Sequence, residues 1–200
     1  MITSSSKRRR VKRGPPPKKP IKRYKCASVL PHLMRDFGGR CAYSMQHFRR
    51  AGKLEVEHFD PRRKKDLIQD YNNLFPASRH CNGKKGAVWP TAAEQAAGCR
   101  FLNPCEEVDY GEQIFEDPAT HLLVGSNPAA IWHIRICGLN ADHLIYERRR
   151  RAEHLATMKR VVRLKGGFYG VADLVNLIAN FREEVESMIP PIPPPPSAAV

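Results

Sequence analysis

Two stretches near the middle of the chain decide its fold: residues 54–61, LEVEHFDP, and residues 70–86, DYNNLFPASRHCNGKKG. Apolar and charged residues alternate in the first stretch until an Asp-Pro pair breaks the pattern, which predicts a short strand that ends close to Glu57 and His58. The second stretch begins as another short extended segment and, after a polar turn, continues as a helix from about residue 82. The sequence therefore predicts two short strands followed by a helix.

Five polar residues recur at definite intervals along these stretches. Asn73 lies fifteen residues after His58, Asn82 lies nine residues after Asn73, and Lys85 follows. The Glu57 carboxylate and an amide oxygen of Asn82 are hard donors that suit Mg²⁺ or Mn²⁺. Imidazole titrates near neutral pH, so His58 suits proton abstraction from water, and Lys85 can meet a phosphate as a point charge. The set is typical of phosphodiester cleavage.

This pattern resembles the HNH endonuclease motif, which is two short strands and a helix around one divalent metal. The resemblance assigns the general base, the orienting asparagine, the two metal ligands and the trailing basic residue to, in that order, His58, Asn73, Glu57 with Asn82, and Lys85. It implies an α+β fold: a small ββα-metal (HNH) core over about residues 38–88, supported by a largely helical half over residues 89–189. It also implies products that carry a 5′-phosphate and a 3′-hydroxyl.

Many HNH proteins hold the site with a structural zinc bound by two CxxC knuckles. Here residues 41–44 read CAYS and residues 78–81 read SRHC, so each knuckle has lost one thiol. Either Cys41 and Cys81 are left without zinc and packing replaces the metal, or His47 or His80 completes the set. Serine is a poor zinc ligand, so we do not expect a structural zinc. His80 is then either a ligand of the catalytic metal or an exposed turn residue.

Similarity extends beyond the motif. Residues 101–107, FLNPCEE, and the segment from Ile134 to Arg148 resemble the HNH nuclease subunits of Septu-type and retron-associated anti-phage defence systems. The resemblance implies a nuclease effector of nucleic acid, with DNA favoured over RNA such as tRNA, in a bacterial or archaeal cytoplasm. The resemblance also implies a separate SMC/ABC-type ATPase subunit. This sequence has no nucleotide-binding loop, so any ATPase activity would have to come from another protein.

The positive charge is concentrated at one end. The chain of 200 residues has a net charge of +14, but eleven of its 34 basic residues and none of its acids lie in residues 1–25, which leaves 23 bases against 20 acids elsewhere. We expect residues 1–25 to be a disordered basic tail, residues 26–189 to be the nuclease domain and residues 190–200 to be a Pro-rich tail. Deleting the basic tail should then weaken nucleic-acid or ATPase binding and leave the site intact.

Basic residues outside the motif are candidates for contact with nucleic acid or a partner. In the tail these are Lys7, Arg8, Arg9, Arg10, Lys12 and Arg13, whose run also resembles a nuclear localisation signal. The run at residues 148–151, with Arg148 and Arg149, is either such a contact or the solvated face of a helix. No apolar segment is long enough to span a membrane, and no secretory signal is recognisable, so we expect a cytoplasmic protein without a membrane partner.

A non-catalytic basic nucleic-acid-binding module is the alternative function, either a degenerate nuclease or a ribosome-associated protein. Such a module has no need for a carboxylate, a histidine and two asparagines at the motif spacing. Its charge would also be spread over the folded surface, whereas residues 26–200 carry only the difference between 23 bases and 20 acids. Both observations favour the nuclease.

Overall fold

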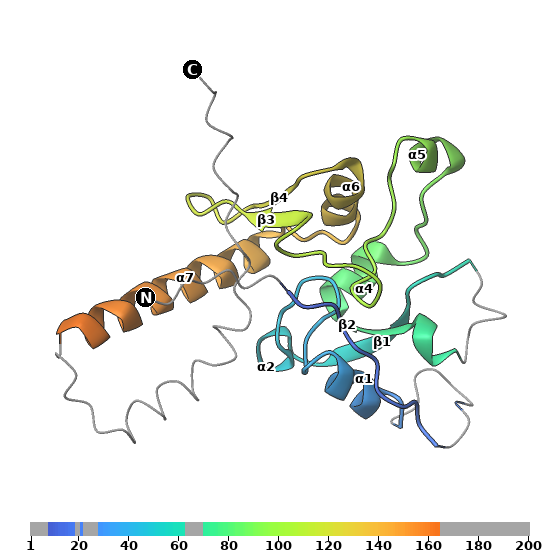
Figure 1. The fold of residues 1–200 in the computed structure, drawn as a ribbon, viewed down its shortest axis with the longest axis horizontal. Coiled ribbons are helices and arrows are strands. Elements are labelled where there is room, and N and C mark those ends of the chain that lie inside the picture. Colours follow the sequence, from blue (N-terminus) through green and yellow to red (C-terminus); the bar gives the residue numbers. More distant parts are fainter. Residues whose placement is uncertain (1–7, 19–20, 22–27, 63–69, 165–200) are drawn as a thin grey trace.

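A computed structural model of the chain describes residues 8–18, 21, 28–62 and 70–164. Within this part of the chain the fold mixes helices with two small antiparallel sheets, which confirms the α+β class (Figure 1). Lys7, residues 165–189 of the expected helical half and the Pro-rich tail at 190–200 lie outside the described residues. Among the helices that are described, none has the length and apolar character needed to cross a membrane.

The first sheet and the helix after it occupy the predicted motif. The elements up to this helix are α1 (Leu30–Asp36), α2 (Phe48–Ala51), β1 (Leu54–His58), the 3₁₀ turn η1 (Tyr71–Asn73), β2 (Leu74–Ser78) and α4 (Arg79–Lys85). Strands β1 and β2 pair antiparallel, with His58 opposite Leu74. The end of β1 therefore lies beside η1, and the two strands run directly into a helix, as the sequence predicts.

Helix α4 begins at Arg79, three residues earlier than expected. The cause is Ser78, whose Oγ accepts a hydrogen bond from the backbone N–H of Cys81 at 3.2 Å and so caps the helix. All five residues of β2 are buried, and both α1 and α4 contact this strand. The motif is thus held between two helices.

The second half of the described chain carries a hairpin as well as helices. Its elements are α5 (Ala92–Ala96), β3 (Ile114–Glu116), β4 (Leu123–Gly125), α6 (Pro128–Ile136) and α7 (Asp142–Leu164). Strands β3 and β4 pair antiparallel as a hairpin, with Phe115 opposite Val124. Helix α6 is capped by Asn127, whose side chain accepts from the Ala130 N–H at 2.9 Å, and a proline opens its first turn.

One apolar core joins the two halves. Its buried members come from the first sheet, from the irregular segment after α5 and from α6, including Phe75, Phe101, Tyr110 and Trp132. The Phe101 ring packs edge-on against Trp132, with 4.7 Å between the ring centroids. The motif and the half that follows it therefore form one packed unit and not two independent ones.

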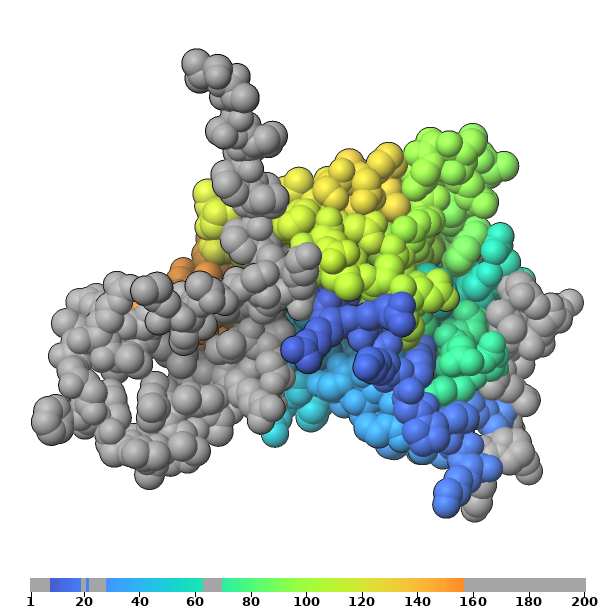
Figure 2. All heavy atoms as spheres, viewed as in Figure 1, coloured from blue at the N-terminus to red at the C-terminus, as the bar shows by residue number. Residues whose placement is uncertain are grey.

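The expectation of a disordered tail is wrong for residues 8–18. These residues, hereafter the strap, run in extended conformation across the body at the junction of its two halves, where Figure 2 shows them in dark blue. The backbone N–H of Arg8 bonds to the carbonyl of Tyr110 at 3.1 Å, and that of Val11 bonds to the carbonyl of Pro104 at 2.7 Å. Hydrogen bonds and guanidinium contacts hold the strap, which is why its poverty in apolar residues did not reveal it.

Candidate active site

Glu57 lies in a buried cluster between β1 and α4. The Lys85 ammonium donates to Glu57 Oε2 at 3.0 Å and to the backbone carbonyl of His58 at 2.7 Å, while the Tyr43 hydroxyl donates to Glu57 Oε1. Lys85 is 0% exposed and Glu57 is 4% exposed. The prediction that Lys85 meets a phosphate is therefore wrong for this arrangement: its charge is used inside the protein, against Glu57.

Burial changes the acidity of Glu57. Removal from water raises the pKa of this carboxyl to about 7, even though the neighbouring Lys85 ammonium lowers it. Burial therefore favours the neutral form of this carboxyl, whereas the Lys85 ammonium favours its charged form.

Asn82 pairs with a different carboxylate from the one expected. Its side-chain N–H donates to Oε2 of Glu55 at 2.7 Å, and both residues are partly exposed. Glu55 and Glu57 are two residues apart on β1, so they share the strand face that meets α4. Three oxygen-bearing side chains thus gather where β1 faces α4, and period-two alternation along LEVEH was the signal that points to Glu55.

This donor set can be tested for its fit to a divalent metal. Two carboxylates and an amide oxygen are the ligand types that Mg²⁺ and Mn²⁺ take, and the Lys85 ammonium shows that Glu57 with the His58 carbonyl already holds a cation. The residues therefore fit in kind. In the arrangement described, both oxygens of Glu57 have protein partners, so Glu55 and Asn82 are the more accessible donors.

His58 ends β1 and is 7% exposed. The segment that follows it is fixed by Asn73 of η1: the Asn73 carbonyl accepts from the Phe59 N–H at 2.8 Å, and its side chain bonds twice to Asp60, accepting from the N–H at 2.8 Å and donating to the carbonyl at 3.1 Å. This is the contact that an orienting role for Asn73 requires.

The two thiols of the half-knuckles lie together. Cys41 and Cys81 are both fully buried and share a hydrogen bond. Burial alone would raise the pKa of Cys41, but hydrogen bonds from Cys81 and Ser44 lower it to about 6, and the pKa of Cys81 is raised well above its usual value because its thiol donates to Cys41. The pair is thus a thiol that donates and a thiol that accepts.

The two histidines considered as extra ligands have other partners. His47 stands at the start of α2, where its Nδ1 accepts from the Arg49 N–H at 3.4 Å. His80 Nε2 lies 2.9 Å from the carbonyl of Gly138, and its ring packs against that of His143 with 4.5 Å between centroids. These contacts occupy His47 and His80 within the protein, so they give no support to the alternatives in which either histidine completes a zinc site or His80 binds the catalytic metal.

The predicted nucleic-acid contact at Arg148 is wrong. This side chain is buried and donates to three acceptors: the carbonyl of His121 at 2.7 Å, the carbonyl of Leu139 at 3.0 Å and the side-chain oxygen of Asn140 at 3.1 Å. It ties α7 to the hairpin and to the end of α6. Arg149 is exposed, so a contact there stays a prediction.

The strap presents its basic residues in two directions. Arg8 points inward, with its guanidinium 2.9 Å from the Asp109 carboxylate and 2.9 Å from the Ala42 carbonyl, and Arg13 is also turned inward and half-buried. Their guanidinium groups are engaged within the protein, so this arrangement does not favour the predicted contact with nucleic acid or a partner at these two residues. The residues that remain exposed, for which that contact stays a prediction, are Arg9, Arg10 and Lys12.

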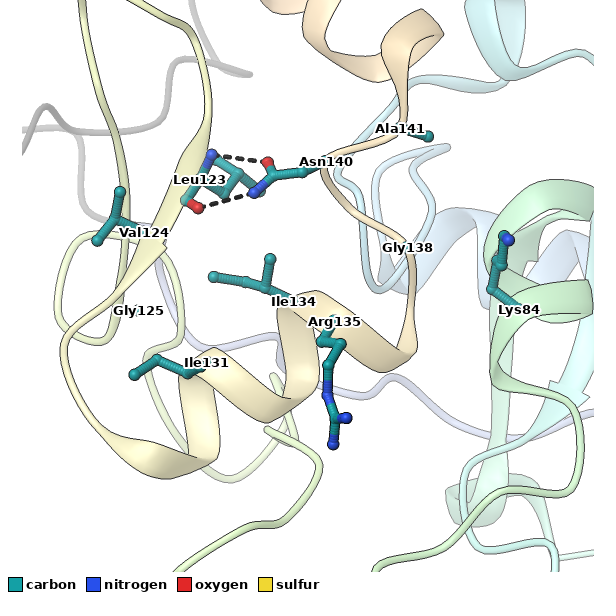
Figure 3. Close-up of a pocket in the computed structure, with 10 residues that line it drawn as sticks. All are labelled: Lys84, Leu123, Val124, Gly125, Ile131, Ile134, Arg135, Gly138, Asn140 and Ala141. Atoms are coloured by element: carbon teal, nitrogen blue, oxygen red, sulfur yellow. Dashed lines mark hydrogen bonds between the residues drawn. The ribbon is translucent and has the colours of Figure 1, made fainter.

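A groove of about 530 Å³ lies apart from this cluster, between β4, α6 and α4. Figure 3 shows Ile131 and Val124 on one side of it and Lys84 on the other, with the Asn140 side chain bonded in both directions to the backbone of Leu123. None of the predicted site residues lines the groove. The candidate site is therefore the face of β1 that meets α4 together with the end of β1.

Comparison of the chain with family models, with curated proteins and with solved structures finds no match.

Proposed function

We propose that this protein is a metal-dependent endonuclease of the HNH type that hydrolyses phosphodiester bonds of nucleic acid, with DNA favoured over RNA. The observation that carries the proposal is the double hydrogen bond from Asn73 to Asp60, because it fixes the chain directly after His58 at the point where β1 meets η1. The order of two antiparallel strands and a helix, with Asn82 on the helix, supports the same function.

Each residue of the site has a defined task in this proposal. His58 accepts the proton of the attacking water, and Asn73 keeps the His58 segment in place. A divalent metal, when bound, supplies charge neutralisation at the phosphoryl oxygens, and the residues that would hold it are Asn82 and the two carboxylates on the same face, Glu55 and Glu57. Lys85 binds both Glu57 and the His58 carbonyl and therefore sets the spacing of the cluster.

The proposal includes a partner. A separate SMC/ABC-type ATPase would deliver the nuclease to its substrate in a defence complex, and the exposed basic residues of the strap and Arg149 are available for nucleic acid or for that partner. Co-purification of the full chain from its native host, followed by identification of the associated proteins, tests this part. Recovery of the chain without an ATPase would refute the partner and leave the nuclease proposal standing.

The decisive experiment is cleavage of plasmid DNA and of total RNA with Mg²⁺ or Mn²⁺, by the full chain alone and with its co-purified partner. His58→Ala should lower the cleavage rate by about a hundredfold or more, the usual contribution of a positioned base. His143→Ala is the matched control, since this histidine is exposed and outside the site. Cleavage that is unchanged in His58→Ala, or that persists in EDTA, would refute the mechanism.

One observation favours the alternative of a non-catalytic nucleic-acid-binding module. The two carboxylate oxygens of Glu57 accept hydrogen bonds from Tyr43 and Lys85. This is what we expect of a degenerate site in which a residue that once bound the metal now forms part of the core. Such a module would bind nucleic acid with a steep salt dependence and cleave nothing in either metal. The cleavage assay therefore separates the two functions.

A further inference from the structure

The strap makes its most extensive contact through one residue, Arg13. Its guanidinium donates to three backbone carbonyls: Tyr71 at 3.2 Å, Asn72 at 3.2 Å and Leu74 at 3.0 Å. Its Nε also donates to the sulfur of Cys105 at 3.3 Å. One side chain of the strap therefore serves a single short turn, η1, and the first residue of β2.

The chemistry of this contact matches the needs of the turn. Only one turn long, η1 has a Tyr71 carbonyl that accepts the Leu74 N–H, and the carbonyls at its end have no donor within the turn. A guanidinium offers five N–H donors in a rigid planar fork, so it can serve several such carbonyls at once.

Aromatic rings fix the guanidinium in place. Its carbon lies 5.1 Å from the ring centroid of Phe37, 5.2 Å from that of Tyr71 and 4.7 Å from that of Phe75. Rings at this range attract the charge and limit its movement. Both the aromatic rings of the core and its own hydrogen bonds therefore hold the Arg13 guanidinium in place.

The same turn carries Asn73, and Asn73 holds the chain after His58. The path runs from Arg13 to the carbonyls around Asn73, and from the Asn73 side chain to the N–H and carbonyl of Asp60. We propose that Arg13 is a positioning residue for the candidate active site, which fixes the turn that carries Asn73 and thereby the segment after His58. The inference deepens the proposed function and rests on it for the identity of the site.

This assignment reverses the expected role of the N-terminal segment. Arg13 faces the body, whereas Arg9 and Lys12 beside it are exposed, and Arg10 is exposed but donates to the carbonyl of Glu106 at 3.3 Å. A polyanion bound to the outer residues would therefore act on the segment that orders the site.

Hydrogen exchange of single backbone amides tests the inference without any substrate. In Arg13→Ala the Asp60 amide, which bonds to the Asn73 side chain, should exchange at least about tenfold faster, since hydrogen bonds to a charged group hold the turn closed. The Ala130 amide, which bonds to the Asn127 side chain in α6, should change less than about twofold. Equal acceleration of both amides would mean a merely structural role and would overturn the inference.

Two further variants keep the test decisive. Lys18→Ala removes the same charge from an exposed position of the strap and should leave the Asp60 amide unchanged. Arg13→Lys keeps the charge but loses the fork, so it should accelerate Asp60 exchange by an intermediate factor. It also serves if Arg13→Ala does not fold. Asp60 exchange at the wild-type rate in Arg13→Lys and Arg13→Ala alike would refute the role of the fork.

Activity gives the second readout. If the chain cleaves nucleic acid, Arg13→Ala should lower kcat by about tenfold or more with KM little changed, because a positioning defect acts on the reacting geometry. A rise in KM alone would overturn the inference in favour of substrate binding. If the wild-type chain cleaves nothing, the proposed function fails, while the exchange measurement still decides whether Arg13 fixes the turn.

Discussion

Replacing Arg8 with alanine should lower the free energy of unfolding by about 3 kcal/mol, although this residue lies in the segment whose composition predicts disorder. Arg8 and Asp109 form an ion pair at 2.9 Å in which the side chains are 9% and 2% exposed. Arg8 also donates to the carbonyl of Ala42. Its loss leaves a carboxylate and a carbonyl without their charged donor inside the protein.

The magnitude follows from the surroundings of Asp109. Breaking a buried ion pair by removing one partner costs about 3–5 kcal/mol. The remaining carboxylate keeps the N–H of Tyr110 at 2.7 Å, and burial already raises its pKa although Arg8 lowers it, so it can take up a proton and limit the loss. The lower end of the range therefore applies. For a domain of this size that loss corresponds to a fall in Tm of about 6–12 °C.

Urea unfolding followed by tryptophan fluorescence measures the effect, with Arg9→Ala as the matched control. Arg9 is the next residue and is exposed, so its replacement should change the free energy of unfolding by less than about 0.5 kcal/mol. The double variant Arg8→Ala with Asp109→Asn should recover part of the loss, because the unpaired charge is gone. Equal, small effects of Arg8→Ala and Arg9→Ala would refute a docked strap.

Three further predictions concern the core and the site. Burial lowers the pKa of His133 to about 3, so the stability that its neutral form contributes is fully present above pH 6.5. Below that value the free energy of unfolding should fall by about 1.4 kcal/mol per pH unit. Urea titrations at several pH values should show a flatter pH dependence for His133→Gln, and an identical pH dependence in both proteins would contradict this. Lys85→Met removes the ammonium that pairs with the Glu57 carboxyl and should lower the free energy of unfolding by about 3 kcal/mol near pH 8. The loss should be smaller near pH 5, where the raised pKa of Glu57 keeps this carboxyl protonated. The double variant with Glu57→Gln should recover more than half of the loss at pH 8. In Mn²⁺ titrations monitored by electron paramagnetic resonance, Asn82→Ala and Glu55→Gln should each weaken binding by more than about tenfold, and unchanged affinity in both would remove them from the ligand set.

Local signals predicted the elements that depend on neighbouring residues. Alternation along LEVEH identified β1, which the structure places at Leu54–His58. The start of α4 was placed too late because the cap at Ser78 lies within the preceding strand and was taken as part of a lost zinc knuckle. The spacing that selected His58 and Asn73 also selected residues that the fold brings together.

Long-range polar contacts were beyond the sequence, because a guanidinium that serves carbonyls leaves no periodic trace. Within the four arginines at residues 148–151, the sequence does not distinguish Arg148, which is buried, from Arg149, which is exposed. The hydroxyl of Tyr43 reaches Glu57 only because the CAYS turn is folded against β1. The partner of Lys85 could not be predicted either. Its position in the sequence is clear, but whether it meets a phosphate or another side chain depends on which face of α4 is covered by the rest of the protein.

The contact between Arg8 and Asp109 also determines when the strap can bind to the body during synthesis of the chain. Arg8 precedes Asp109 by 101 positions, so the ribosome releases Arg8 long before it has made the carboxylate that binds it. The entropic cost of closing a loop grows only with the logarithm of its number of residues. Docking of the strap is therefore delayed by the time needed to synthesise Asp109 and not by the time needed to close the loop. The strap is therefore translated before the surface that it binds, and a chain that has not yet been synthesised as far as Asp109 exposes the basic residues that the folded protein holds against its body.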